Sequence, residues 1–387
     1  MSSNRLNLMD MQLAINYLGV SRSTIDRWRK DKHLPFIKIG KEILFDKNEL
    51  DDWVHAHSIK KQNVKTTVTI GYQSGTAHMW TALLMKELKY FEEELYVHFP
   101  SQPFSINWCN AYSGLELVEL MIKGEVQIAS LGDYPMAICN ELSKVLPNFN
   151  SVILAFDGKT RNGSGISFVT PKEAKIHLEE LFQAPISTVT NSSAHIRLRS
   201  FIAALGEEVQ PKVIHQQMRE SMESIAQQRI GGSVMWEPYP SLIRYYETGK
   251  ILVDEVKGED YLTGIVSENS WLRNHEGVTI SYLKAHIRIH QLIRNNPEKA
   301  ARILSTCTKI PFKVVMQVIS KVYWDSTIYS RDLETLKKIS SSTMTCMDDG
   351  SPFLVRTEYL QSAIDELNLP LLQQPIVQGD WSTDFLY

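Results

Sequence analysis

Strand-like and helix-like segments alternate along most of this chain, and that alternation limits the fold to the α/β class. The apolar run at 68–72 has the length and composition of a buried strand, and apolar residues recur at helical spacing over 77–88. Repeated strand–helix units of this kind form mainly parallel sheets covered by helices. We expect further strands at 105–108, 127–130, 151–156, 165–169, 186–190, 212–215 and 232–235, and further helices at 115–123 and 196–204.

The composition indicates a globular protein without a membrane partner. The chain has 387 residues, 43% of them hydrophobic, which is enough for two or three domains. The first ten residues are polar, and no apolar run approaches the roughly 18 residues of a membrane span. The four cysteines are scattered, which predicts reduced thiols and no metal site. We therefore expect a cytoplasmic protein.

The first sixty residues contain two short helices joined by a tight turn. Asp10 can cap a helix over 11–18, and Gly19 provides the left-handed backbone that the end of this helix needs. Ser21 can cap a second helix over 22–30. This arrangement predicts a helix-turn-helix unit, whose second helix reads DNA.

A hairpin and a third helix complete the N-terminal module. The strands 36–39 and 42–45 flank a Gly-Lys turn, and Asp46 with Glu49 can cap a helix that ends near residue 56. Arginine binds guanine edges or phosphates, and short hydroxyls bind either. The candidate DNA-binding residues are Arg22, Ser23, Thr24 and Arg27 on the second helix, and Lys38 and Lys41 near the hairpin tip.

Residues through this module match a known pattern without a gap. They are Ala14, Tyr17-Leu18-Gly19-Val20-Ser21, Thr24-Ile25, Trp28, Leu34-Pro35, Ile39-Gly40 and Leu50-Asp51-Asp52-Trp53. The string resembles the excisionase and MerR-type winged helix-turn-helix family, which implies a double-stranded DNA operator as partner for residues 1–57. Asp26 departs from the pattern, because an acidic side chain on the reading helix repels phosphate. The alternative is a small helical interaction module that does not bind DNA.

Charge and composition separate this module from the rest of the chain. Residues 1–62 carry a net charge of +3, and the remainder carries −6. A basic head on an acidic body suits DNA binding by the head. The polar segment 58–66, with Lys60 and Lys61, lacks a periodic apolar pattern and is interpreted as a linker.

Five motifs follow in order along the body. They are Gly71-Tyr72-Gln73-Ser74-Gly75-Thr76, Ser113-Gly114, Ile128-Ala129-Ser130-Leu131-Gly132-Asp133-Tyr134-Pro135, Ser192-Ser193-Ala194-His195 and Met235-Trp236-Glu237-Pro238-Tyr239. Residues 67–340 resemble the periplasmic-type solute-binding proteins for sulfonate, taurine, nitrate and thiamine-pyrimidine uptake. The resemblance implies a type II periplasmic-binding-protein-like body of two α/β lobes, the second at about 166–260, that close on a ligand by hinge motion. Residues 341–387 are a C-terminal extension without an assignment.

The candidate ligand site lies at the ends of the predicted strands. Ligands of open α/β sheets bind beyond the carboxyl ends of strands, where helices begin, and free amides at helix N-termini favour anions. The candidate ligand-binding residues are Ser74, Gly75, Thr76, His78, Ser113, Gly114, Asp133, Ser192, Ser193 and His195.

Several of these residues have a second interpretation. The Ser192-Ser193 pair can cap a helix, and Asp133 can cap one instead of binding an amine on the ligand. His78 and His195 can each donate a hydrogen bond to an anion, or can instead form a hydrogen bond with a neighbouring residue. Trp80, Trp108 and Trp236 can line the cleft or pack in the core, where tryptophan is often found.

These features predict a cytoplasmic one-component transcription regulator. Its body would sense a small anionic or zwitterionic metabolite, and its head would bind an operator as part of a homodimer, because one small head offers few base contacts. One alternative is a transport-linked solute-binding protein with an accessory N-terminal module. The other is an enzyme of the thiamine-pyrimidine-synthesis type, but the cysteine cluster of that branch is absent here and no cofactor is expected.

Overall fold

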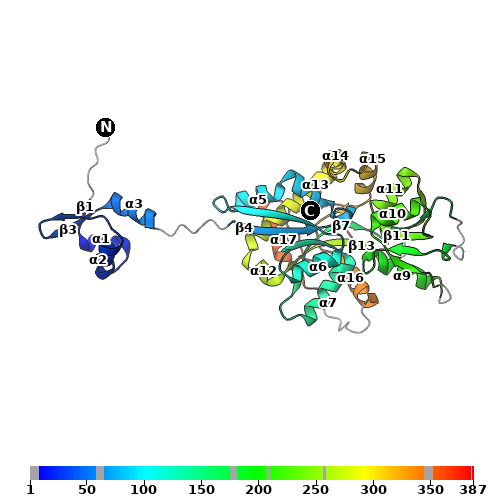
Figure 1. The fold of residues 1–387 in the computed structure, drawn as a ribbon, viewed down its shortest axis with the longest axis horizontal. Coiled ribbons are helices and arrows are strands. Elements are labelled where there is room, and N and C mark those ends of the chain that lie inside the picture. The colour runs from blue at the N-terminus through cyan, green and yellow to red at the C-terminus, as the bar shows by residue number, and fades with distance from the viewer. Residues whose placement is uncertain are drawn as a thin grey trace. The chain divides into compact units, whose positions relative to one another are not determined.

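The structure is a computed structural model that describes residues 8–57, 65–174, 181–206, 210–255, 259–343, 352–384 and 386–387. The chain divides into two compact units, which we call the head (Met1–Val64) and the body (Lys65–Tyr387) (Figure 1). Residues 58–64 of the expected linker, including Lys60 and Lys61, lie outside the described residues.

The head contains the helices and the hairpin that its sequence predicts. The Asp10 carboxylate accepts a hydrogen bond from the Leu13 amide at 2.8 Å, and Gly19 ends the first helix with a φ of 64°. A short additional strand, β1, pairs with the hairpin strand β3 and was not expected from the sequence. The elements are β1 (Leu8–Met9), α1 (Met11–Leu18), α2 (Arg22–Asp31), β2 (Ile37–Ile39), β3 (Glu42–Asp46) and α3 (Lys47–His57).

A small apolar core holds the head together. It is formed by Ala14, Ile25, Leu34, Phe45 and Leu50, each no more than 1% exposed. These residues come from all three helices, the hairpin and the segment between α2 and β2. The head therefore has a core of its own.

The body has two lobes, each built on one sheet, and the expected two-lobed α/β fold is confirmed (Figure 1). The first sheet has the order β14-β7-β13-β6-β4-β5 and the second β10-β9-β11-β8-β12. The strands of the first are β4 (Thr66–Tyr72), β5 (Phe104–Asn110), β6 (Ile128–Gly132), β7 (Ser151–Thr160), β13 (Tyr261–Glu268) and β14 (Tyr323–Trp324). Those of the second are β8 (Ser164–Pro171), β9 (Ile186–Thr188), β10 (Val213–His215), β11 (Gly232–Trp236) and β12 (Gly249–Glu255).

Both sheets are mixed, so the expectation of mainly parallel sheets was wrong. β4 is parallel to β5 and β6, but β13 is antiparallel to both β6 and β7. In the second lobe β8 is antiparallel to β11 and β12. The chain leaves the first lobe after β7 and returns with β13, which enters the sheet in the opposite direction. Strand–helix alternation alone does not show such a return.

Helices cover the sheets of both lobes. In the first half of the body they are η1 (Ala77–Met79), α4 (Trp80–Leu88), α5 (Tyr90–His98), α6 (Gly114–Ile122) and α7 (Asp133–Val145). The second lobe has α9 (Ser193–Ala204), α10 (Met218–Ala226) and α11 (Tyr239–Tyr246). After the return come α12 (Asn269–Asn274), α13 (Glu276–Asn295), α14 (Pro297–Thr308), α15 (Phe312–Ile319), α16 (Ser330–Thr343) and α17 (Thr357–Glu366). No helix in the described ranges is long and apolar enough to cross a membrane.

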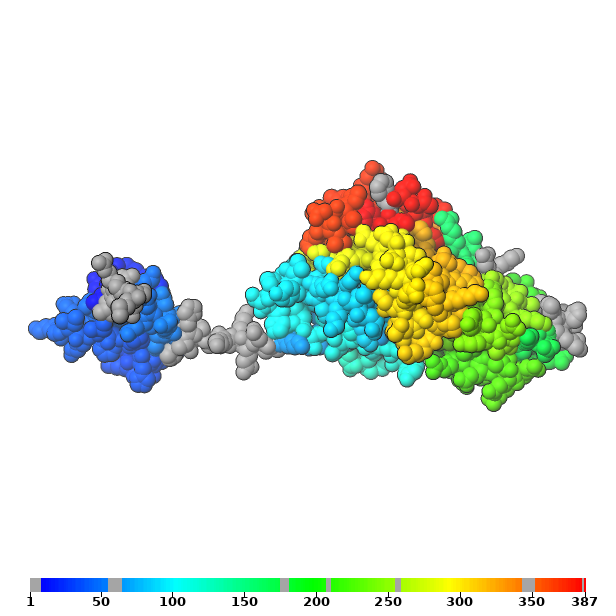
Figure 2. Space-filling model, turned by 90° about the horizontal axis from the view of Figure 1, so that it is seen from above, coloured from blue at the N-terminus to red at the C-terminus, as the bar shows by residue number. Residues whose placement is uncertain are grey.

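The C-terminal segment, unassigned from sequence, is part of the first lobe. Helix α17 packs on α13, and Val355 forms a parallel bridge with Ile153 of β7. The last residue, Tyr387, is 3% exposed, and its carbonyl accepts from the Ser326 amide at 2.7 Å. Figure 2 shows this segment, in orange to red, against the yellow helices of the same lobe.

Candidate functional site

Helix α2 and the hairpin of the head present exposed cations. Arg22, Arg27, Lys38 and Lys41 are all exposed, as expected for DNA-binding residues. Within the described residues, Arg27 and the two lysines form no ion pair. Their charges are therefore available to a polyanion.

The two hydroxyl candidates on α2 are held at the start of the helix. The Ser21 hydroxyl lies 2.9 Å from the hydroxyls of both Ser23 and Thr24, and it accepts from the Thr24 amide at 3.3 Å. These bonds satisfy the helix terminus and fix the rotamers of both side chains. A contact from the Ser23 or Thr24 hydroxyl to DNA would therefore form in addition to its hydrogen bond with Ser21.

The acidic residue on α2 is neutralised within the helix. Asp26 accepts from Arg29 at 2.9 Å and lies 4.0 Å from Arg22. The Arg29 guanidinium also stacks over the Phe36 ring at 4.1 Å, and its side chain is only 16% exposed. The repulsion that Asp26 would exert on phosphate is therefore offset locally.

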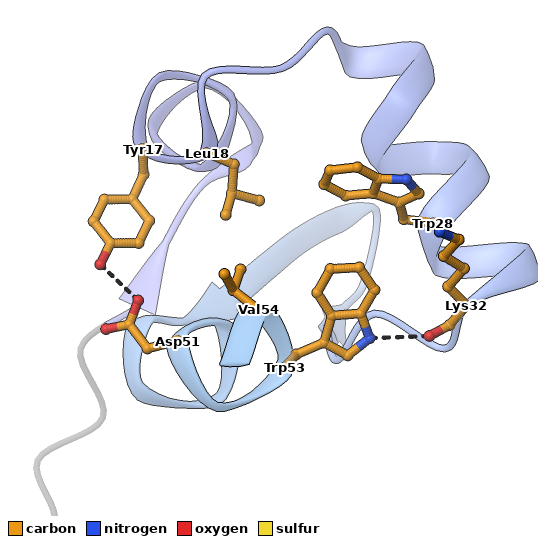
Figure 3. A pocket seen from close by; sticks show the side chains of 7 residues that line it. All are labelled: Tyr17, Leu18, Trp28, Lys32, Asp51, Trp53 and Val54. Carbon is orange, nitrogen blue, oxygen red and sulfur yellow. Dashed lines mark hydrogen bonds between the residues drawn. The ribbon is translucent and has the colours of Figure 1, made fainter. Parts of the chain in front are cut away.

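A pocket of about 430 Å³ lies among the three helices of the head (Figure 3). The Tyr17 hydroxyl of α1 donates to Asp51 of α3 at 2.7 Å, and the Trp53 indole donates to the Lys32 carbonyl at 2.9 Å. The Trp53 ring lies 5.4 Å from the Trp28 ring of α2, measured between centroids. These contacts fasten α3 to the helix pair, so we interpret them as structural.

The body has a cleft of about 530 Å³ whose walls come from both lobes. Ser74, Gly75 and Thr76 line it, as the sequence predicts. The remaining walls are Gln73, Asn110, Ala111 and Tyr112 from the first lobe, and Gln217, Met218, Arg219, Glu220, Glu223, Trp236 and Tyr239 from the second. The cleft thus carries one arginine and two glutamates on α10.

Hydrogen bonds between the lobes close the floor of the cleft. The Trp236 indole donates to the Gly75 carbonyl at 2.9 Å, and the Ala77 amide donates to the Glu237 carbonyl at 2.9 Å. A side chain at Gly75 would meet the Tyr239 hydroxyl at 2.9 Å. Glycine at position 75 therefore permits the close approach of the two lobes.

A second, much smaller space of about 20 Å³ brings together the other hydroxyl candidates. Ser113 and Gly114 line it from the first lobe, and Ser192 and Ser193 line it from the second. Ser113 and Ser192 both act as helix caps, since each hydroxyl accepts an amide at the start of α6 or α9. Ser113 and Ser192 therefore each cap a helix and also line this space.

Asp133 is paired inside the protein. Its carboxylate accepts from Arg197 of α9 at 2.7 Å, and both side chains are at most 4% exposed. Arg197 also donates to the carbonyls of Ser193 and Asp260, at 3.0 and 2.9 Å. This buried ion pair joins α7 of the first lobe to α9 of the second, and Asp133 lines neither space.

The two candidate histidines also lie outside the walls of both spaces. His78 is fully buried, its ring is tilted against that of Tyr261, and its Nε2 lies 3.2 Å from the Thr160 hydroxyl. Burial lowers the pKa of His78 to about 3, so the ring is neutral at physiological pH. The Nδ1 atom of His195 accepts from the Asn191 amide at 3.0 Å, and partial burial lowers its pKa as well. Neither ring offers an anion a positive charge.

Sequence reasoning missed the α10 side of the cleft. The predicted residues lie at strand ends that begin helices, but Gln217, Arg219 and Glu223 follow the short strand β10 and a loop. Gln217 stands at the start of α10 and forms no capping hydrogen bond through its side chain. The signal that could have found them is the end of the predicted strand at 212–215.

Comparisons with known proteins agree with both parts. Residues 9–58 match the HTH_17 helix-turn-helix domain model. A sequence comparison with curated proteins found no significant match.

Among the solved structures that are similar at low identity are three binding proteins. The alkanesulfonate-binding protein SsuA of Xanthomonas axonopodis pv. citri, bound to MOPS, has a TM-score of 0.58 at 13% identity, over 73% of this chain and 93% of that one. The aliphatic sulphonate-binding SsuA of Escherichia coli has a TM-score of 0.56 at 14% identity, over 71% and 91%. The nitrate-binding protein NrtA of Synechocystis PCC 6803 has a TM-score of 0.59 at 15% identity, over 81% and 92%. The chain thus joins a helix-turn-helix domain to a body with the fold of periplasmic solute-binding proteins.

Proposed function

We propose that this protein is a one-component transcription regulator that binds a small metabolite in its body and an operator through its head. The observation that carries the proposal is the presence, in one chain, of a helix-turn-helix domain and a two-lobed body with a cleft lined by both lobes. Because the body would act by binding, no turnover of the ligand is needed. In this proposal the protein binds DNA and therefore works in the cytoplasm. It is a homodimer, because two identical heads bind the paired half-sites of an operator.

The cleft suits a zwitterion or a small anion that also carries donors. Arg219 and the uncapped first turn of α10 supply a positive region. Glu220 and Glu223 lie on the same helix and would accept from an amine. Asn110 and Tyr112 face them from the first lobe. Taurine and other aminosulfonates, aminopyrimidines and nitrate are the compounds to try first.

Control of DNA binding would come from closure of the lobes. A ligand shifts an equilibrium only by its differential affinity for the two states, and the coupling is reciprocal. A ligand that bridges α10 and the first-lobe loops favours the closed body. In a dimer that closure would reposition the paired heads.

A ligand screen followed by one substitution tests the proposal. Thermal shift of the full-length protein against the compounds above should identify a stabilising ligand. Arg219 is exposed and lines the cleft on α10, so Arg219→Glu should reduce affinity for that ligand more than tenfold, because it puts a negative charge where the anion would bind. Ser200→Glu, at an exposed position of α9 that does not line the cleft, should leave affinity unchanged. Calorimetry measures both.

Two results would contradict the proposal. Ligand binding by Arg219→Glu with the affinity of the parent would exclude the cleft as the binding site. A ligand that binds the body but leaves the affinity for DNA unchanged would exclude a sensing role, and would favour a solute carrier with an accessory head.

A further inference from the structure

Three side chains that commonly bind metals meet in the core of the first lobe. Asp157 lies on β7, and His286 and His290 lie one turn apart on the same face of α13. All three are at most 1% exposed, and none lines the cleft or the smaller space described above. The regulatory function proposed above does not use them.

The spacing of the three groups fits a tetrahedral metal site. The Nε2 atoms of His290 and His286 lie 3.3 and 3.6 Å from the same oxygen of Asp157. One ligand atom from each residue lies within 4.8 Å of the other two. Ligands about 2.0–2.1 Å from a tetrahedral zinc ion are separated by about 3.3 Å.

Hydrogen bonds on the far side of both rings direct Nε2 toward the carboxylate. The Nδ1 atom of His286 lies 3.0 Å from the Ser326 hydroxyl, and Nδ1 of His290 lies 3.0 Å from the Tyr387 carbonyl. A carbonyl only accepts, so Nδ1 of His290 carries a hydrogen. Histidines that ligate metals through Nε2 are oriented by this kind of bond.

The cluster also contains an unpartnered buried atom. Among the residues that the structure describes, Nε2 of His286 has no hydrogen-bond partner, although it lies 3.6 Å from Asp157. Within the described residues, no lysine or arginine pairs with Asp157, and the basic side chains beside its carboxylate are the two histidines. The hydroxyls of Thr81 and Ser130 donate to its carboxylate. A buried carboxylate without a cationic partner is costly, and a bound cation removes that cost.

We propose that Asp157, His286 and His290 bind a zinc ion that stabilises the first lobe. Two imidazoles and one carboxylate are ligands that zinc accepts, whereas calcium and magnesium prefer oxygen alone. The ion would fasten α13 to β7. Through the bond from His290 to Tyr387 it would also hold the C-terminal segment against the lobe.

Metal titration of the full-length protein tests this proposal. After dialysis against a chelator, the protein should bind one equivalent of zinc in competition with a chromophoric chelator. His286→Gln and His290→Gln should each weaken zinc binding by at least about a hundredfold, because each removes a ligand. The control is His275→Gln, near the start of α13, whose ring bonds to and stacks on Trp271 and lies outside the cluster, so this change should not affect binding.

A second measurement covers the case in which the variants do not fold. X-ray absorption at the zinc edge of the parent protein should show two imidazoles and oxygen, without sulfur. Absence of stoichiometric binding by the parent overturns the proposal and leaves the cluster as a buried hydrogen-bond network. Parent-like affinity in both histidine variants, or a ligand set with sulfur or fewer than two imidazoles, overturns it as well.

Discussion

Two arginines on one helix of the head have different environments. Arg29 is largely buried against Phe36 and pairs with Asp26, whereas Arg27 is exposed without an ion pair in the described residues. An arginine that is already desolvated and paired has little to offer DNA. The exposed Arg27 is the residue positioned to contact a base or a phosphate.

We therefore expect Arg27→Ala to weaken operator binding by about 1–3 kcal/mol if the side chain reads a base. Fluorescence anisotropy with a DNA fragment selected by the protein from a random pool would measure the loss. Arg302→Ala, on an exposed surface of the body, is the matched control. Equal affinities of parent and Arg27→Ala would remove this residue from the interface.

At the scale of the helix, the starts of α6 and α9 show how one serine serves two purposes. Each cap satisfies an amide that the helix leaves free, and each also places a hydroxyl at the smaller space between the lobes. The two serines therefore stabilise their own helices whether or not a ligand is bound.

We expect Ser192→Ala to lower the free energy of unfolding by about 0.5–2 kcal/mol, because α9 loses its cap. The hydroxyl accepts from the His195 amide at 3.3 Å and donates to the Val189 carbonyl at 2.6 Å. Ser200→Ala, at an exposed position later in α9, should cost less than the cap variant. Urea denaturation compares the two, and equal losses would show that the cap adds nothing.

On the scale of the molecule, the head and the body are two compact units. The head has its own apolar core, and the body has larger cores in both lobes. A substitution deep in the body should therefore not unfold the head. The pair between Asp133 and Arg197 offers a test, because it joins the two lobes.

Arg197→Met should destabilise the body by about 3–5 kcal/mol, because it leaves the buried Asp133 carboxylate without its cation. Calorimetry should show a lower Tm for the transition of the body and an unchanged transition of the head. The double variant with Asp133→Asn should recover part of the loss. A parallel shift of both transitions would contradict the division into independent units.

The sequence was most informative where local rules decide the structure. Asp10 and Ser21 cap helices because their own side chains reach amides three residues on, and Gly19 takes the left-handed backbone regardless of distant contacts. The strand–helix alternation likewise determined the α/β class. These features depend on short-range chemistry that a sequence displays directly.

Tertiary structure decided what depends on residues far apart in the chain. The return of β13 made the first sheet mixed, and β8 did the same in the second. The approach of the lobes paired Asp133 with Arg197, 64 residues later. In the proposed metal site, Asp157 meets His286 and His290 of α13. Asp157 and His290 are 133 positions apart in the chain. Local spacing determines which atoms a helix or strand can offer. Only the packing of those elements determines which of them meet, because burial removes water and makes each polar group find a partner in the fold.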